Sequence, residues 1–409
     1  MGAPLRVLLV TDWMPAHGGA EAYASALRAG LTAVGIDVRL LTSSAGTAAQ
    51  GTAEFVAFGT QRRSAQAFLQ VVNPFAVRQA RAAVRAFHPD VALVHLFAYH
   101  LSPAVLWALG DVPLVMTVLD YKIVCPLGSK LLPTGEICHQ PAGLPCWQSG
   151  CLTLPHWLRD QARYGCISAA LERVQLVLAC SHHVQRELLV NDIESEFLHL
   201  PVAAPGPSFR RQPADHPQFV FSGRVSVEKG VPLLIRAFAQ LHARVPRARL
   251  RIVGDGPLRG DIERAVAALD LCGVVTFTGW LDPAGVDRQL EDAWALVAPS
   301  IWAEPFGMVA PEAIMRGVPV IASRTGGFSE TVEDEVSGLL FSNGDEHALT
   351  HCLERVALGL AFPSHRLDED VITRGVQTWS MESHVSIVRG HLEGIAGRAR
   401  KFVSPAKLA

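Results

Sequence analysis

Short apolar runs of strand length alternate along this chain with longer, helix-compatible intervals. In the first half, the apolar runs predict strands at 6–11, 37–41, 55–58, 91–94, 113–118, 174–179 and 197–200. A second set begins at 218–221 and continues at 249–253, 274–277, 294–298 and 318–322. Strands that alternate with helices are typical of doubly wound parallel sheets. The pattern therefore predicts an α/β fold of two consecutive Rossmann-like domains.

A linker separates the two sets of strands. Residues 202–217 are poor in strand formers and contain the prolines Pro205, Pro207, Pro213 and Pro217, which is a linker composition. With 409 residues the chain also exceeds the length at which a single core stops growing. We therefore expect a first domain over residues 1–203, a second over 204–375, and a central cleft between them that closes around a ligand.

Composition and charge exclude some classes of protein. Apolar residues make up 49% of the chain and charged residues 18%, and the net charge of −2 offers no broad basic surface for nucleic acid. No run approaches the ~18 to 20 consecutive apolar residues of a membrane-spanning helix. The apolar run at 7–10 is not followed by a cleavage site, so we expect a cytoplasmic protein. Its eight cysteines should then be reduced thiols or metal ligands.

One stretch could bring the protein to the inner face of a membrane. Between residues 62 and 87, apolar side chains such as Phe68 and Phe75 are interleaved with arginines, a pattern that suits an anionic lipid surface. The alternative is a helix packed on a sheet with its arginines in solvent. Pro74 interrupts the pattern, which favours the packed helix and leaves peripheral membrane association as the second interpretation.

The segment from Trp302 to Ala313 combines two acids with a helix start. It follows a predicted strand and leads into a helix that should end near Gly317. The first amides of a helix have no intrahelical acceptor and lie at the positive end of its dipole, which suits a phosphate. Glu304 and Glu312 can accept hydrogen bonds from sugar hydroxyls. One segment could thus hold both halves of a nucleotide-sugar, although two acids on an ordinary surface helix are the alternative.

Glycine-bearing loops follow the other strands of the second set. After 219–221 come Gly223, Arg224 and Lys229; the glycine leaves room for a ligand, and the two cations can neutralise the charge that develops on a leaving diphosphate. Two solvated bases beside a loop are the alternative. Similar loops occur at 254–257, 278–281 and 324–330. Because the carboxyl ends of parallel strands share one edge of the sheet, these loops should lie together.

Taken in order, these motifs resemble glycosyltransferase family 4, a large group of retaining enzymes with the GT-B fold and of the group 1 type. The residues that carry the resemblance are Gly18–Glu21, Gly223–Arg224, Lys229–Gly230, Gly254–Pro257, Glu304–Gly307 with Glu312, and Gly326–Gly327 with Glu330. The resemblance implies a GT-B architecture, in which two Rossmann-like doubly wound domains face a central cleft. It also implies that the terminal segment 376–409, with a helix from about 381 to 395, crosses back to the first domain.

The resemblance implies a role for each motif. Arg224, Lys229 and Glu304 would be the catalytic residues, with the two cations on the donor diphosphate and Glu304 on the transferred sugar. Glu312 would bind the ribose. Further donor-binding residues would be Gly18, Gly19, Gly223, Asp255, Trp280, Leu281, Phe306, Gly307, Met308 and Val309. No cofactor or catalytic metal is required, and the donor is a nucleotide-diphosphate sugar, with UDP or GDP as the favoured nucleotide.

The reaction that the resemblance implies keeps the anomeric configuration of the sugar. The leaving phosphate oxygen would take the proton of the acceptor, which is a hydroxyl of a glycan, a lipid-linked sugar or a small molecule, as in polysaccharide biosynthesis. Candidates on the acceptor side are Trp13, His95, His100 and Asp120. The alternatives are a sugar-nucleotide epimerase or phosphorylase of the same fold, and a catalytically silent nucleotide-sugar-binding protein.

One position departs from the family pattern. Where relatives read Thr-Leu-His-Asp, this chain has Thr117-Val118-Leu119-Asp120, and a leucine cannot donate a hydrogen bond to the 6-hydroxyl that the family histidine meets. We therefore hypothesise that the donor sugar lacks a 6-hydroxyl and is a 6-deoxyhexose or a pentose, within the wider expectation of a hexosyl-, deoxyhexosyl- or pentosyltransferase. The other version is that His95 or His100 takes the place of the missing histidine.

Four cysteines lie in a long insertion at 120–155, and loops of that length usually have a reason. Cys125, Cys138, Cys146 and Cys151 could hold zinc or an iron–sulfur cluster as a structural metal site, although no two have the spacing of a zinc knuckle. The alternative is that they are free thiols that pack a loop over the acceptor site.

Overall fold

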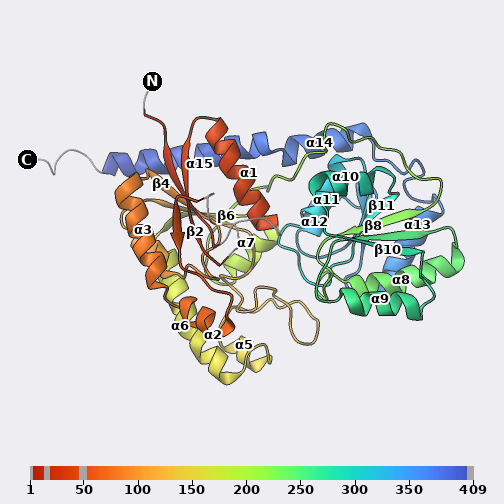
Figure 1. The fold of residues 1–409 in the computed structure, drawn as a ribbon, viewed down its shortest axis with the longest axis horizontal. Coiled ribbons are helices and arrows are strands. Elements are labelled where there is room, and N and C mark those ends of the chain that lie inside the picture. Colours follow the sequence, from red (N-terminus) through yellow and green to blue (C-terminus); the bar gives the residue numbers. More distant parts are fainter. Residues whose placement is uncertain (1–2, 13–18, 46–52, 403–409) are drawn as a thin grey trace, which may run out of the picture. The chain divides into compact units, whose positions relative to one another are not determined.

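The computed structural model describes residues 3–12, 19–45 and 53–402 of the chain. The chain divides into two compact units, each built on its own sheet (Figure 1). The first unit comprises residues 1–134, 138–199 and 381–409, and the second comprises residues 135–137 and 200–380. Within the described ranges, no helix has the length and apolar character needed to cross a membrane.

A parallel sheet of seven strands organises the first unit. Its spatial order is β3, β2, β1, β4, β5, β6, β7. The strands are β1 (Arg6–Val10), β2 (Asp37–Ser43), β3 (Phe55–Ala57), β4 (Val91–Val94), β5 (Leu114–Val118), β6 (Val174–Ala179) and β7 (Glu196–Phe197). All residues of β4 and β5 are buried, which explains their continuous apolar runs, because a parallel sheet is covered by its crossover helices.

The helices of the first unit come from both ends of the chain. They are α1 (Gly19–Ala33), α2 (Arg63–Leu69), α3 (Pro74–Phe87), α4 (Ala104–Ala108), α5 (Leu144–Gln148), α6 (Leu154–Leu171), α7 (His182–Leu189) and α15 (Met381–Phe402). The last of these packs on α1 and on β4. A Cβ built on Gly30 of α1 would lie 2.6 Å from a methyl carbon of Val385, so the glycine permits the close approach of α1 and α15.

The amphipathic stretch 62–87 forms the two helices α2 and α3. Pro74 stands in the first turn of α3, and the side chain of Asn73 caps the helix by accepting from the amides of Phe75 and Ala76. The alanine face of α3 is buried against β2 and β3, as the packed-helix interpretation predicts. Phe68 and Phe75 stay exposed, at 81% and 51%.

A parallel sheet of six strands organises the second unit, in the order β10, β9, β8, β11, β12, β13. The strands are β8 (Gln218–Ser222), β9 (Arg249–Val253), β10 (Val275–Gly279), β11 (Ala295–Ala298), β12 (Val320–Ser323) and β13 (Gly338–Phe341). The helices are α8 (Val231–Arg244), α9 (Arg259–Ala268), α10 (Pro283–Glu291), α11 (Val309–Met315), α12 (Phe328–Thr331), α13 (Glu346–Ala357) and α14 (Glu369–Trp379). The predicted pair of doubly wound sheets is thus confirmed, with β13 as a strand that the sequence pattern did not reveal.

In each sheet the strand order reverses beside the strand that comes first in the chain. β1 lies between β2 and β4, and β8 lies between β9 and β11. In doubly wound sheets, ligands bind outside the carboxyl ends of the strands at such a switch point. The residues that follow β1 and β4, and those that follow β8 and β11, are therefore the places where each unit should carry a site.

Candidate functional site

The switch point of the second unit brings together three polar side chains from the loops after β8 and β11. Lys229 Nζ donates to Glu304 Oε1 at 2.7 Å, and Ser300 Oγ donates to the same oxygen at 2.6 Å. The Glu304 residue is only 5% exposed. Within the described part of the chain, its second oxygen, Oε2, accepts no hydrogen bond. One carboxylate oxygen is thus fixed in place while the other is available to a ligand.

Backbone contact between two loops places Lys229 beside Glu304. Gly230 has a φ of +69°, and a Cβ built on it would overlap the carbonyl oxygen of Pro299. The glycine therefore lets the loop after β8 lie directly on the loop after β11. The Lys229 ammonium also lies 5.6 Å from the centre of the Trp302 ring, a favourable distance for a cation over an aromatic face.

Arg224 lies on the same loop as Lys229, but its side chain forms no hydrogen bond with Lys229, Ser300 or Glu304. Its side chain is exposed, and it forms no ion pair with a carboxylate among the residues that the structure describes. Gly223 beside it has a φ of +148°, a backbone conformation that favours glycine. The guanidinium is therefore free to meet an anion from solvent.

The loop that carries Glu304 rests on two glycines from the loop after β12. The amide of Gly327 donates to the carbonyl of Glu304 at 2.7 Å, and a Cβ on Gly326 would overlap that same carbonyl oxygen. Gly307 has a φ of +79°, and a Cβ there would overlap the ring of Phe328. Gly326 and Gly327 thus pack directly against the backbone of the loop that carries Glu304.

The rest of that loop leads into α11 as the sequence predicts. Phe306 is 4% exposed, so its side chain belongs to the core and its backbone is what a ligand could meet. Met308 precedes the first helical residue, Val309, and gives no side-chain cap. The amide of Ala310 already donates to the carbonyl of Gly307 at 3.0 Å, and Pro311 has no amide hydrogen. Gly317, with a φ of +69°, follows the end of α11.

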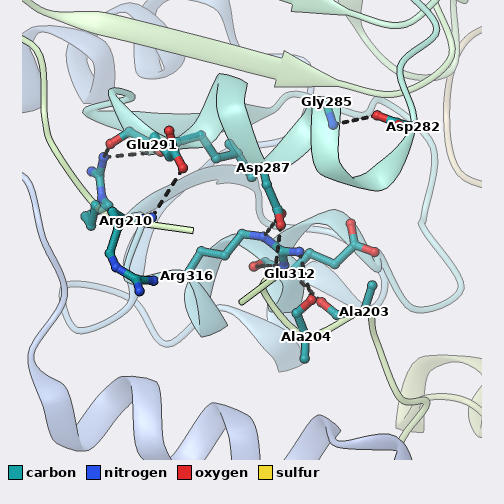
Figure 2. A network of polar contacts seen from close by, with 12 residues as sticks. Ala203, Ala204, Arg210, Asp282, Gly285, Asp287, Glu291, Glu312 and Arg316 are labelled. Atoms are coloured by element: carbon teal, nitrogen blue, oxygen red, sulfur yellow. Dashed lines mark hydrogen bonds and ion pairs between the residues drawn. The ribbon is translucent and has the colours of Figure 1, made fainter. Parts of the chain in front are cut away.

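Glu312 lies on α11 beside a buried ion pair (Figure 2). Arg316 Nε donates to Asp287 Oδ1 at 2.6 Å, and its Nη1 donates to the carbonyls of Glu312 and Ala203 at 2.8 and 3.0 Å. The Glu312 carboxylate itself takes no bond from the residues drawn in Figure 2. Burial raises its pKa to about 7, against the opposing effect of Arg316. A desolvated carboxylate without a donor is suited to accept hydrogen bonds from a ligand hydroxyl.

The loops after β9 and β10 complete the same edge of the sheet. Asp255 holds its own turn, because its Oδ1 accepts from the amide of Gly256 at 2.7 Å. A Cβ on Gly254 would overlap the carbonyl oxygen of Gly223, so this glycine allows two loops to touch. Trp280 is 56% exposed and Leu281 partly exposed.

Of the amino-terminal candidates, Gly19 begins α1, and Gly18 and Trp13 lie outside the described residues.

The switch point of the first unit carries a pocket between the loops after β4 and β5. His95, Leu119 and Asp120 all line it, together with Tyr99 and Lys122. Two of the acceptor-side candidates, His95 and Asp120, thus lie in the same pocket as Leu119, the residue that replaces the family histidine. His100 is buried at 2% exposure and is not part of this lining.

An aspartate outside the sequence motifs holds the loop after β4. Asp12 follows β1 and accepts from the amides of Tyr99, His100 and Leu101, each at 2.7 Å. Burial raises its pKa to about 6 although the three amides favour the charged form. The sequence feature that indicates Asp12 is its position just after the apolar run of β1, at the carboxyl edge of the predicted sheet.

Asp120 is the centre of a second polar group in this pocket. Tyr99 Oη donates to Asp120 Oδ2 at 2.7 Å, and the amide of Lys122 donates to Oδ1 at 2.9 Å. Burial raises the pKa of Asp120 and lowers the pKa of the Lys122 ammonium to about 8. Arg163, 1% exposed, lies behind them and donates to the carbonyl of Ala98 at 3.2 Å.

The four cysteines of the insertion line one largely apolar pocket. Burial raises the pKa of the Cys146 and Cys151 thiols. Across the described residues, no group of three or more His, Cys, Asp or Glu side chains is arranged to hold a metal ion. The insertion is anchored by Lys130, whose Nζ pairs with Glu187 Oε2 at 2.7 Å in a buried site.

Two family models match the chain. The model for a glycosyl transferase 4-like domain matches residues 18–200, and the model for glycosyl transferases group 1 matches residues 208–359. The second match contains Arg224, Lys229, Glu304 and Glu312, and the first contains His95 and Asp120. The two switch points thus fall in the two matched domains.

Curated relatives align with the chain over limited lengths. The D-inositol 3-phosphate glycosyltransferase of Saccharomonospora viridis is 37% identical over 155 residues, which are 36% of this chain and 36% of that protein. An uncharacterized glycosyltransferase of Methanocaldococcus jannaschii is 35% identical over 125 residues, or 31% of this chain and 32% of the other. The chain therefore spans about a third of the length of these relatives.

Solved structures share the fold over nearly the whole chain. Sucrose-phosphate synthase from Thermosynechococcus elongatus has a TM-score of 0.74 at 23% identity, over 97% of this chain and 100% of that one. The Anabaena protein HepE, in complex with UDP, has a TM-score of 0.69 at 17% identity, over 95% and 100% of the two chains. At these identities the likeness concerns the fold.

Proposed function

Because the chain belongs to glycosyltransferase family 4, with its group 1 domain and GT-B fold, we propose that it moves a sugar from a nucleotide-diphosphate donor to an acceptor hydroxyl with retention of configuration. The observation that carries this proposal is the cluster of Lys229, Ser300 and Glu304 at the switch point of the second unit. We assign donor binding mainly to the predicted second domain, residues 204–375, and acceptor binding mainly to the predicted first domain, residues 1–203.

The proposed chemistry uses the two cations on the leaving group. The bond between the anomeric carbon and the phosphate oxygen breaks, a bond from that carbon to the acceptor oxygen forms on the same face, and the phosphate oxygen takes the acceptor proton. Negative charge grows on the diphosphate as the first bond breaks. Lys229, already fixed by Glu304, and Arg224, open to solvent, are the groups that would stabilise it.

The two acids would hold the sugars on either side of the diphosphate. Glu304 has one oxygen engaged by Lys229 and Ser300, so its other oxygen suits a hydroxyl of the transferred sugar. Glu312 has a desolvated carboxylate without a donor in Figure 2, which suits the ribose hydroxyls. Backbone amides of residues 307–309 and the surface of Trp280 would contact the phosphate and the base.

The nucleotide and the sugar are proposed more narrowly from two observations. HepE was solved with UDP, so UDP-sugars are the first donors to test, followed by GDP-sugars. Leu119 lies in the lining of the first unit's pocket, and an apolar side chain there suits a 6-deoxyhexose or a pentose rather than a 6-hydroxyl. Acceptors remain a broad class, a hydroxyl of a glycan, a glycolipid or a small molecule.

A donor screen on the purified protein tests this function. Hydrolysis of UDP-, GDP-, ADP- and dTDP-sugars, and their transfer to an added alkyl glycoside, should be detectable for the wild type. Lys229→Ala and Glu304→Gln should each lower kcat about 10²- to 10³-fold, the scale of losing one transition-state contact. Arg236→Ala, which removes an ion pair between α8 and Glu346 of α13, is the matched control and should leave kcat unchanged.

The other outcomes identify the rival functions. Sugar isomerisation without transfer would indicate an epimerase, and a rate that depends on inorganic phosphate would indicate a phosphorylase. Tight nucleotide-sugar binding without any turnover would indicate a silent binding protein. Equal activity of Lys229→Ala and the wild type would contradict the assigned site itself.

A further inference from the structure

One histidine at the switch point of the first unit has unused hydrogen-bonding capacity. His95 follows β4 directly and is 4% exposed. Among the described residues, neither its Nδ1 nor its Nε2 has a hydrogen-bond partner. A buried polar group left unpaired costs about 1–3 kcal/mol, and native proteins retain few such groups. His95 lies at the point at which a doubly wound sheet binds its ligand.

The groups packed on His95 keep its ring neutral and, among the described residues, form no hydrogen bond with either ring nitrogen. The Tyr23 ring stacks on it with centroids 5.1 Å apart, and the Tyr23 hydroxyl is 2.9 Å from His384 Nε2. Burial lowers the pKa of His95 to about 3, with a smaller effect of His384. A neutral imidazole offers one N–H donor and one acceptor nitrogen. A sugar hydroxyl can accept from the N–H or donate to the other nitrogen, and because the two nitrogens point in different directions one hydroxyl meets one of them.

The pocket beside His95 combines an apolar wall with one carboxylate. Its wall is apolar at Met116, Val118 and Leu119. Its carboxylate, Asp120, is already engaged by Tyr99 and by the amide of Lys122. Of the side chains in this lining, His95 is the one whose ring nitrogens are both buried and unpaired among the described residues.

We propose that His95 binds a hydroxyl of a sugar that enters this pocket and so determines which sugar the enzyme accepts. The inference deepens the proposed transferase function and rests on it. It also distinguishes between the two histidines that could replace the missing family histidine at Leu119, because His95 lines the pocket and His100 does not. The sugar belongs either to the donor or to the acceptor, and both present the same chemistry.

Two substitutions separate hydrogen bonding from packing. His95→Phe keeps an aromatic ring against Tyr23 and removes both nitrogens, whereas His95→Asn keeps one donor and one acceptor. Thermal unfolding is measured first, and His95→Met serves as the apolar variant if the phenylalanine variant does not fold. Each protein is then assayed with the best donor of the screen and with its monodeoxy derivatives. Octyl glucoside and its monodeoxy derivatives provide the corresponding acceptor series.

The expected result is specific to one hydroxyl. For the parent sugar, kcat/KM of His95→Phe should fall about 10- to 100-fold, which is the effect of losing one hydrogen bond and leaving the sugar hydroxyl unpaired in the pocket. For the one derivative that lacks the bound hydroxyl, wild type and variant should be nearly equal, and His95→Asn should recover part of the discrimination. A response in the donor series assigns the hydroxyl to the donor, and a response in the acceptor series assigns it to the acceptor.

An equal change for all derivatives in both series, or no change, would overturn the inference and leave His95 as a core residue. Calorimetric titration of the same donors and glycosides into wild type and His95→Phe makes the comparison without turnover. Failure of the wild type to transfer any sugar would instead contradict the proposed function. The two failures are therefore distinguishable.

Discussion

At the scale of single residues, Glu312 illustrates a conflict between stability and ligand binding. Its carboxyl is desolvated and has a pKa near 7, against 4.5 for an ordinary glutamate. The unfolded chain therefore loses this proton near pH 4.5 and the folded protein only near pH 7, so the group makes folding less favourable as the pH rises through that window. Above pH 7 the loss is complete.

Glu312→Gln should remove that penalty. We expect the variant to be more stable than the wild type by about 2 kcal/mol at pH 8, after allowance for partial exposure of the side chain, and equal to it near pH 4. Donor affinity should fall about 10- to 100-fold, because a charged acceptor for the ribose is lost. Urea unfolding at both pH values and calorimetric titration with the donor measure the two effects.

A comparison variant separates the site from general charge effects. Glu263→Gln removes an exposed carboxylate of α9 that pairs with Arg259, and it should change neither stability nor affinity by much. If Glu312→Gln lost stability at pH 8, the carboxylate would have a stabilising partner that Figure 2 does not show.

Single residues also show what the sequence could and could not predict. Lys229 and Glu304 were expected at one sheet edge because both follow predicted parallel strands, and they do form an ion pair. Ser300 was not expected, because a serine after a strand has many other uses. Asp12 was missed for a related reason, since its three amide donors come from residues 99–101, which only the tertiary fold brings close.

At the scale of elements, the alternation of apolar runs predicted the order of strands, while contacts between loops required the structure. β13 escaped notice because its four residues, Gly338–Phe341, follow a polar stretch without a clear period. The Gly326–Gly327 motif was expected near the ligand. The structure shows it beneath the Glu304 loop, a role that depends on packing between two loops far apart in sequence.

Gly230→Ala tests the loop contact that places Lys229. The new Cβ would overlap the carbonyl oxygen of Pro299 and would also require a φ of +69°. We expect a loss of about 2–4 kcal/mol of stability, from backbone strain plus the displaced loop, and a donor affinity at least 10-fold weaker. Denaturant unfolding and donor titration give the two values.

Gly344→Ala is the matched control for this element. Gly344 has nearly the same φ, +73°, but nothing lies within 4 Å of a Cβ built there. Gly344→Ala should therefore lose only about 1–2 kcal/mol of folding stability, the cost of a left-handed backbone conformation for alanine. It should keep the affinity of the wild type for the donor. If the two variants behaved alike, the approach of the loops after β8 and β11 would have no part in placing the cation.

At the scale of the whole molecule, the chain leaves the second unit at Ser380 and ends in the first with α15. The contacts of α15 include the bond between His384 and Tyr23 at 2.9 Å and the approach of Val385 to Gly30. Its buried residues Val388, Leu392 and Ile395 are between 0% and 5% exposed. Residues 385–396 of α15 therefore contribute to the core of the first unit.

A chain that ends at residue 380 should consequently lose stability in the first unit, although it is cut next to the second. Hydrogen exchange should rise in α1 and β4, which pack on α15, and stay unchanged in β8 and β11, whose burial does not involve it. Nucleotide binding by the second unit should survive for the same reason. A chain that ends at residue 402 keeps every described contact of α15 and should match the full chain. Faster exchange spread evenly over both sheets would mean instead that the two units unfold as one.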